Sequence, residues 1–169
     1  MYRSIFAMTL LFTALTASPT HYLLPDQASD ALYKLKQLIN SAQHEIVIIT
    51  PRLESKRVRK ALEKSAKKGT DITLISSPGT PADSAYLAQF KNISLMQLSG
   101  LQHDTGRGEL QLTLLLVDDA RYCTLSMPLS EAEMSRNIAQ AVCDSEEKEG
   151  EIYRQYIQTL RARARDYLQ

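Results

Sequence analysis

The sequence has few of the residues that catalysis and metal binding most often use. Its 169 residues include no tryptophan, only three histidines and only two cysteines, and they contain no internal repeat or low-complexity tract. The formal net charge is +1, so bulk charge gives no reason to expect a nucleic acid or an anionic membrane as partner. A chain of this length is expected to form one domain that buries about two-thirds of its unfolded surface.

The N-terminal segment, residues 1–20, is predicted to be a signal peptide or an N-terminal membrane anchor. Arg3 precedes an apolar run over residues 5–17, and Pro19 follows it. This order is typical of a secretory signal, and the run is shorter than the ~20 apolar residues that span a bilayer. We therefore expect export to the periplasm or another extracytoplasmic compartment and a folded domain over 21–169. A buried N-terminal helix is the alternative.

The two cysteines, Cys123 and Cys143, both fall on predicted late strands. In an exported chain an even number of cysteines suggests a disulfide. The alternative is that both are small buried hydrophobic residues, as free cysteines often are. We predict that the two strands are neighbours, with the Cα atoms inside the ~7 Å that a bridge requires.

Hydrophobic spacing predicts strands separated by helices, followed by a hairpin and a last helix. Helices are expected over 26–43, 55–68, 82–91 and 147–168, and strands over 46–49, 72–75, 93–98, 109–119 and 137–142. Asp26 is the expected N-cap of the first helix, and Gly69 is expected to end the second. The last helix carries an apolar stripe that we expect to face the core: Ile152, Tyr156, Leu160, Ala164 and Tyr167. The pattern predicts a single α/β domain with a mixed sheet between helical layers.

The most informative stretch is residues 109–119, ELQLTLLLVDD, a buried-type strand that ends in two carboxylates. It resembles the signature strand of the phospholipase D superfamily, in which a His-x-Lys-x4-Asp pattern precedes a hairpin and a Gly-Ser-x-Asn-like turn. Gln111 stands at the histidine position and Thr113 at the lysine position, whereas Asp118 matches the aspartate. Two of the three signature residues are therefore replaced.

The resemblance extends in order over roughly residues 27–168. Segments similar to the family's helices, strands and turns lie at 40–51, 60–75, 122–130 and 137–142. In the turn that follows the signature strand, only Ser126 is retained, with Leu125 and Pro128 in place of the glycine and the asparagine. The resemblance implies the phospholipase D-like fold, a mixed sheet sandwiched between helices.

The resemblance also implies a mechanism that this sequence is not equipped to perform. In the family, the histidine attacks phosphorus, the lysine holds the phosphoryl oxygens, and two motif copies meet at a twofold interface. Strand alternation would place Gln111 and Thr113 on one side, where they offer neither a nucleophile nor a charge. Removing a nucleophile costs on the order of 10⁴–10⁶ in rate. We expect a pseudoenzyme that acts as a scaffold or as a homodimer or heterodimer partner of a phospholipase D-like homologue.

An enzyme with a shared or unorthodox active site is the first alternative function. His103, followed by Asp104 on a Gly-rich loop, is the histidine nearest in sequence to the signature strand. These two residues together with Asp118 and Asp119 match no metal-ligand spacing. We expect neither a metal nor another cofactor.

A basic module that docks on anionic envelope lipid is the second alternative. The segment 52–68 is rich in basic residues, including Lys56, Arg57, Arg59 and Lys60, and such surfaces attract lipid headgroups or phosphate backbones. A solvated helix face is the simpler interpretation. No aromatic residue interleaves with these bases, as binding of single strands requires, so a nucleic acid is not the expected partner.

Overall fold

The computed structural model describes residues 18–78, 82–98, 102–103, 106–107 and 109–166 of the chain, with the backbone alone at 82–83, 102–103, 106–107 and 166. Its main element is an eight-stranded sheet in the order β1-β9-β8-β7-β2-β3-β4-β10. The strands are β1 (Thr20–Leu24), β2 (Glu45–Thr50), β3 (Asp71–Ser76), β4 (Ile93–Gln97), β7 (Thr113–Val117), β8 (Arg121–Leu125), β9 (Ala139–Asp144) and β10 (Arg165–Asp166). A separate two-stranded ribbon joins β5 (Gln102–His103) to β6 (Gly106–Arg107).

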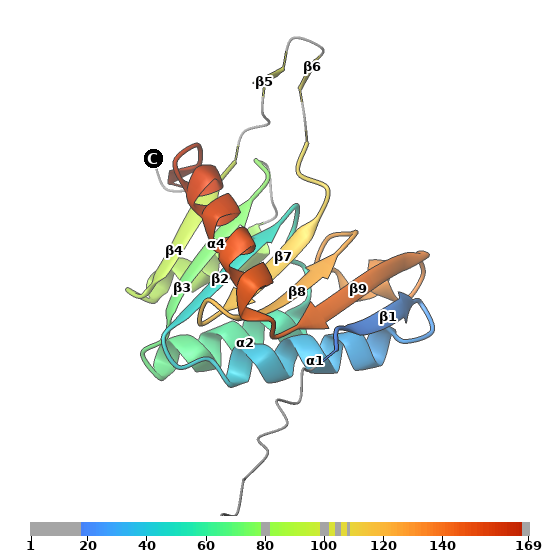
Figure 1. The fold of residues 1–169 in the computed structure, drawn as a ribbon. Coiled ribbons are helices and arrows are strands. Elements are labelled where there is room, and N and C mark those ends of the chain that lie inside the picture. The colour runs from blue at the N-terminus through green and yellow to red at the C-terminus, as the bar shows by residue number, and fades with distance from the viewer. Residues whose placement is uncertain (1–17, 79–81, 99–101, 104–105, 108, 167–169) are drawn as a thin grey trace, which may run out of the picture.

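The sheet is mixed, as the sequence predicts. β2, β3 and β4 run parallel to one another, and the remaining pairings are antiparallel. Helices α1 (Ala28–Asn40) and α2 (Lys56–Lys67) cover one face, and α4 (Glu147–Arg161) covers the other (Figure 1). A 3₁₀ helix, η1 (Ala82–Gln89), precedes β4, and the short α3 (Glu131–Met134) precedes β9. The predicted single α/β domain, with a mixed sheet between helical layers, is confirmed.

Two hydrophobic cores lie on the two faces of the sheet. In β2, Ile46 and Ile48 pack with the α1–α2 side, whereas Val47 and Ile49 pack with the α4 side. All four side chains are at most 3 % exposed. A strand covered on both faces needs apolar residues at every position, which explains the continuous apolar run in the sequence.

The last helix differs from its prediction. It ends at Arg161, and Ile152 and Tyr156 of the expected core stripe are 58 % and 43 % exposed. Steps of four residues over-rotate by about 40° each on a helix of 3.6 residues per turn, so the predicted stripe winds around the helix. The face that packs on the sheet carries Gly150, Tyr153, Ile157, Leu160 and Ala164.

Other boundaries were also predicted incorrectly. The strand expected over 109–119 is regular only at Thr113–Val117, and the helix expected over 82–91 is a 3₁₀ helix. Gln27, whose side chain accepts the Leu23 amide at 2.7 Å and makes no capping hydrogen bond to the helix, is the N-cap of α1 in place of Asp26. Gly69 does follow α2, with a φ of +93°. Tyr167, the last member of the expected stripe, lies outside the described residues.

The chain enters the fold through β1, a strand that sequence spacing did not predict. Residues 1–17 lie outside the described residues, so the signal or anchor stays a prediction. Thr20, which we had placed at the end of that segment, is paired with Cys143. Among the helices of the described part, none is long and apolar enough to span a membrane.

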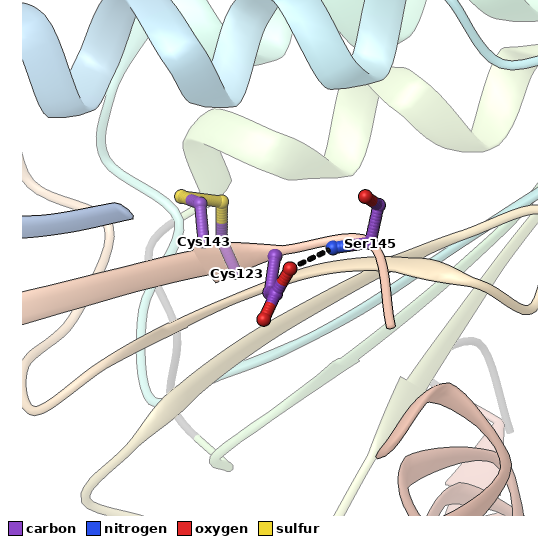
Figure 2. Close-up of a disulfide and its surroundings, with 4 residues drawn as sticks. Cys123, Cys143 and Ser145 are labelled. Atoms are coloured by element: carbon purple, nitrogen blue, oxygen red, sulfur yellow. Dashed lines mark hydrogen bonds between the residues drawn. A yellow bond between two sulfur atoms is a disulfide. The ribbon is translucent and has the colours of Figure 1, made fainter. Parts of the chain in front are cut away.

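The two cysteines face each other across β8 and β9 and form a disulfide. Cys123 and Cys143 are direct partners in the antiparallel register, with a Cα–Cα distance of 4.1 Å. Figure 2 shows the bridge on the side of the sheet that faces α1 and α2. Next to the bridge, the Ser145 amide donates a hydrogen bond to the Asp144 carboxylate. Both cysteines are at most 2 % exposed in the α1–α2 core. The bridge therefore ties neighbouring strands inside the core.

Candidate functional site

The residues that the sequence comparison placed at the family's signature positions lead to one edge of the sheet, at which strand ends and loops meet. β2 and β3 end here, the antiparallel β7 begins here, and β8 ends here. We call the residues of this region, 50–57, 111–113 and 126–138, the site edge. It includes α3 and the first turn of α2. In open sheets, binding sites form beyond the carboxyl ends of parallel strands.

Thr113, at the lysine position, is buried at the floor of the site edge. Its side chain is 0 % exposed. Its hydroxyl donates a hydrogen bond to the Met127 carbonyl oxygen at 2.7 Å and lies 2.8 Å from the hydroxyl of Thr50. The Thr50 hydroxyl in turn accepts the Leu129 amide at 3.2 Å and lies 2.9 Å from the Arg52 carbonyl oxygen. The two hydroxyls thus satisfy one another and the neighbouring backbone.

Gln111, at the histidine position, is exposed and precedes the first paired residue of β7. We expected Gln111 and Thr113 to share one side of a continuous strand, and this expectation was wrong because the ladder begins only at the Thr113–Leu125 pair. One residue is therefore on the surface and the other is in the interior. Thr113 and Thr50 form a polar floor whose oxygen atoms are closed off from solvent.

Two arginines of the site edge, Arg52 and Arg57, are held by carboxylates. The guanidinium of Arg52 is paired with Glu54 at 3.1 Å and also with Glu133 of α3. The guanidinium of Arg57 lies 3.3 Å from Glu131, the first residue of α3. A phosphate group would have to compete with these internal carboxylates.

Glu131 is bound tightly enough to remain ionised. It accepts hydrogen bonds from the Ser55 hydroxyl at 2.9 Å and from the Arg57 amide at 3.0 Å. Burial raises its pKa, but these donors and the charges of Arg57 and Arg59 outweigh burial, so the net pKa is lowered. Sequence reasoning missed this residue. The sequence did contain a signal for the helix that begins at Glu131. Ser130 and Glu133 have the spacing of a capping box, and the Ser130 side chain does cap α3.

Asp118, which matches the signature aspartate, lies at the opposite end of β7. Five residues of extended chain separate it from Thr113, roughly 17 Å. Its carboxylate accepts the backbone amides of Gln43, His44 and Glu45 at 2.8–3.1 Å and is paired with Arg121. Burial raises its pKa, but the amide donors and Arg121 lower it more, so the net pKa lies below the ordinary value. This aspartate holds the start of β2.

Ser126, the retained residue of the turn motif, is an exposed residue at the end of β8. Its hydroxyl accepts the Gln140 amide at 3.2 Å, and its own amide donates to the Gln140 carbonyl oxygen. Gln140 also contacts the ring of His21 at 2.8 Å. Ser126 thus continues the pairing of β8 with β9 into the site edge.

The structure does not test the histidine alternative. His103 is paired through its backbone with Gly106 in the β5–β6 ribbon, and only the backbone is described there. Asp104 lies outside the described residues. Figure 1 shows the ribbon beyond the ends of β4 and β7, at the same side of the sheet as the site edge. Across the described part of the chain, no group of three or more His, Cys, Asp or Glu side chains could hold a metal.

The four basic residues singled out on α2 divide into two pairs. Lys56 and Lys60 are exposed and have no ion-pair partner among the described residues. Arg57 is paired with Glu131, and Arg59 acts electrostatically on Tyr86. The arginines thus take part in the fold, whereas the lysines face solvent.

A comparison with known families agrees with this fold. Residues 35–161 match the family described as "Cardiolipin synthase, PLD-like domain". This match covers most of the chain, and the chain therefore belongs to the phospholipase D-like family. No curated protein matches the sequence.

Solved structures with the same fold include two bacterial proteins. NucT from Helicobacter pylori is 20 % identical with a TM-score of 0.83, and the match covers 89 % of this chain and 99 % of that one. Nuc from Salmonella typhimurium, a phospholipase D family member, is 18 % identical with a TM-score of 0.67, over 89 % and 97 % of the two chains. TrmBL2, an archaeal chromatin protein, is 12 % identical with a TM-score of 0.63, over 91 % and 56 %. At these identities the similarity establishes the fold alone.

Proposed function

We propose that this chain is an exported phospholipase D-like protein that binds a partner and does not hydrolyse phosphodiesters. The observation that carries the proposal is the burial of Thr113, whose hydroxyl is bound by Met127 and Thr50 at the position of the family's lysine. Gln111, at the position of the nucleophile, has no lone pair that attacks phosphorus near neutral pH. Arg52 and Arg57 of the site edge are paired with glutamates.

The catalytic half of the proposal is tested by hydrolysis of bis-p-nitrophenyl phosphate by the purified protein in EDTA, which removes metal-dependent contaminants. We expect no turnover above background. Turnover that disappears in a His103→Ala variant would overturn the proposal and place the active site in the β5–β6 ribbon. Turnover that appears only after a phospholipase D-like homologue is added, and exceeds that homologue's own rate, would support a shared site.

Exposed apolar side chains at the site edge support a partner at this surface. Ile138, between α3 and β9, is 96 % exposed, and Leu112, beside Thr113, is 38 % exposed. The buried core of a protein interface is more apolar than the rest of the surface and is depleted of charged residues. Exposed aliphatic side chains at one edge of the sheet are therefore suited to the centre of such an interface. The partner we propose is a second phospholipase D-like domain, either a copy of this chain or a homologue.

Light scattering of the full chain tests the partner half. We expect a dimer that dissociates at least about tenfold more readily in the Ile138→Asp variant, since losing one buried aliphatic anchor corresponds to at least this factor. Ile152→Asp on α4 is the matched control. Ile152 is also exposed, at 58 %, but it lies two residues after Gly150, which packs on the β7–β8 turn at the end of β7 opposite the site edge. A monomer at all concentrations, together with no capture of a homologue, would contradict this half.

A further inference from the structure

The two helical layers that enclose the sheet carry different charges. α2, with the sequence KRVRKALEKSAK, has six basic residues and one acidic residue, Glu63. α4, on the other face, has three basic and three acidic residues in EKEGEIYRQYIQTLR. The small net charge of the whole chain therefore hides a strongly basic layer on one side of the molecule.

The basic residues of α2 are arranged as a stripe. Val58, Ala61, Leu62, Ser65 and Ala66 are buried against the sheet. The opposite side carries what we call the basic face: Lys56, Lys60, Lys64 and Lys67. Because residues three and four apart are neighbours on a helix, the four ammonium groups form one row. Only Lys67 has an ion-pair partner among the described residues, Glu63 at 2.5 Å.

The basic face continues onto α1. Lys68, directly after α2, donates a hydrogen bond to the Asn40 carbonyl oxygen at 3.3 Å. Asn40 lines an open hollow of about 300 Å³ on α1 together with Tyr33, Lys36, Gln37 and Ser41. Tyr33 is 68 % exposed. A row of lysines thus ends beside a solvent-exposed aromatic ring and a further lysine.

We propose that the α1–α2 layer docks this protein on an anionic lipid bilayer. Clustered lysines are attracted to anionic leaflets, and tyrosine favours the headgroup region. The apolar run over residues 5–17 precedes β1, and β1 packs against α1 (Figure 1). An anchor in that run would hold this same layer near the membrane.

A nucleic acid fits the basic face less well. The charges are compact ammonium groups, whereas bidentate phosphate recognition uses arginine, and both arginines of α2 are engaged within the fold. The sequence of α2 itself contains no aromatic residue that could stack on bases between the lysines. The basic face shares only Lys56 with the site edge, and the docking proposal does not depend on the loss of catalysis.

The test is co-sedimentation of the full chain with vesicles of phosphatidylcholine alone or mixed with phosphatidylglycerol. Three proteins are compared: the wild-type protein, the α2 variant Lys56→Glu/Lys60→Glu/Lys64→Glu, and the control variant Arg136→Glu/Lys148→Glu/Arg163→Glu. The side chains of the control residues are exposed and form no ion pair among the described residues, and the substitutions change the net charge by the same amount. All three proteins keep the same N-terminal segment, so its contribution to binding cancels in the comparison.

We expect binding to the anionic vesicles that weakens at least about 100-fold in the α2 variant, since each lysine contributes roughly one kilocalorie per mole near such a surface. The control should retain most of the affinity, and ~1 M salt should release the wild-type protein. Equal loss in both variants, or equal binding to neutral vesicles, would overturn the proposal. Duplex DNA that binds more tightly than vesicles, and loses affinity in the same α2 variant, would instead assign the surface to nucleic acid.

Lys56→Gln/Lys60→Gln/Lys64→Gln provides a second measurement that is less open to folding defects. It removes the attraction without adding repulsion, so its affinity should fall between those of the wild-type protein and the glutamate variant. Thermal unfolding of every variant should match the wild-type transition, because the side chains of the three lysines are exposed and form no hydrogen bond or ion pair among the described residues. Unchanged vesicle binding by the folded glutamine variant would also overturn the proposal.

Discussion

The polar side chains at the two ends of β7 differ in their hydrogen-bond partners and in their burial. At the Asp118 end, the residue that matches the family pattern binds three backbone amides and an arginine. At the Thr113 end, the residue that departs from the pattern is buried among backbone carbonyl and hydroxyl groups. The matching residue is one whose carboxylate the fold itself needs. The replaced residues stand where the fold accepts a neutral side chain.

The Asp118 end is held from a second side by α4. Asp118 and Asp119 both have positive φ, 48° and 62°, in the turn between β7 and β8. Gly150 of α4 packs so closely on this turn that a Cβ atom there would lie 2.5 Å from the Asp119 carbonyl oxygen. Arg154 adds an ion pair to Asp119 at 3.0 Å. The turn is therefore a structural junction between β2 and α4.

The largest effect is expected from placing a lysine at the Thr113 end. Thr113→Lys would bury an ammonium group among groups that are already hydrogen-bonded, and we expect a loss of at least about 3 kcal/mol in unfolding free energy. Gln111→His, at an exposed position, should change stability by less than about 0.5 kcal/mol. Urea unfolding measures both. The double variant should remain inactive on a diester, and a stable, active double variant would show that the floor opens readily.

The next effect is expected at the other end of the strand. Asp118→Asn keeps a residue that tolerates positive φ but weakens the bonds to three amides and to Arg121, so we expect a loss of about 2 kcal/mol. Asp119→Asn is the matched control, because its carboxylate is 48 % exposed in the ion pair with Arg154, and such pairs contribute about 0–1 kcal/mol. Equal losses in urea unfolding would mean that the carboxylate of Asp118 has no special structural role.

A smaller effect is expected from removing only the buried hydroxyl. Thr113→Val keeps the shape of the side chain but leaves the Met127 carbonyl and the Thr50 hydroxyl without this partner, so we expect a loss of about 1 kcal/mol. Thr113→Ser retains the hydroxyl and tests the methyl group alone. If valine proves less destabilising than serine, packing of the methyl group and not hydrogen bonding governs this position.

The smallest effect is a dependence of stability on pH. Asp118 has a lowered pKa in the folded protein, so its contribution is fully present above the unfolded value of about 3.9 and is lost as the pH falls through the folded value. Between about pH 5 and pH 3, wild-type stability should therefore fall more steeply than that of Asp118→Asn. Parallel curves in thermal unfolding would assign the acid sensitivity to other carboxylates, such as Glu131, whose pKa is also lowered.

Sequence reasoning was most successful where the pattern is local. The apolar run of β2, the Gly69 end of α2 and the mixed order of helices and strands follow from spacing within a few residues. It failed where an element is formed by pairing with a distant strand. β1 depends on β9, more than a hundred residues later, and β10 on β4. Neither edge strand has a hydrophobic pattern strong enough to predict it alone.

The sequence by itself determined that Gln111 and Thr113 provide no nucleophile and no charge, and that Asp118 retains its carboxylate, because these are properties of the side chains. Only the tertiary structure decided that the Thr113 hydroxyl is sealed against Met127 and Thr50, and that α3 supplies the carboxylates that neutralise the arginines of the site edge. Periodicity predicts which side of a strand a residue occupies, but what covers that side depends on segments some 60 to 80 residues away, as in the Thr50–Thr113 and Arg52–Glu133 contacts.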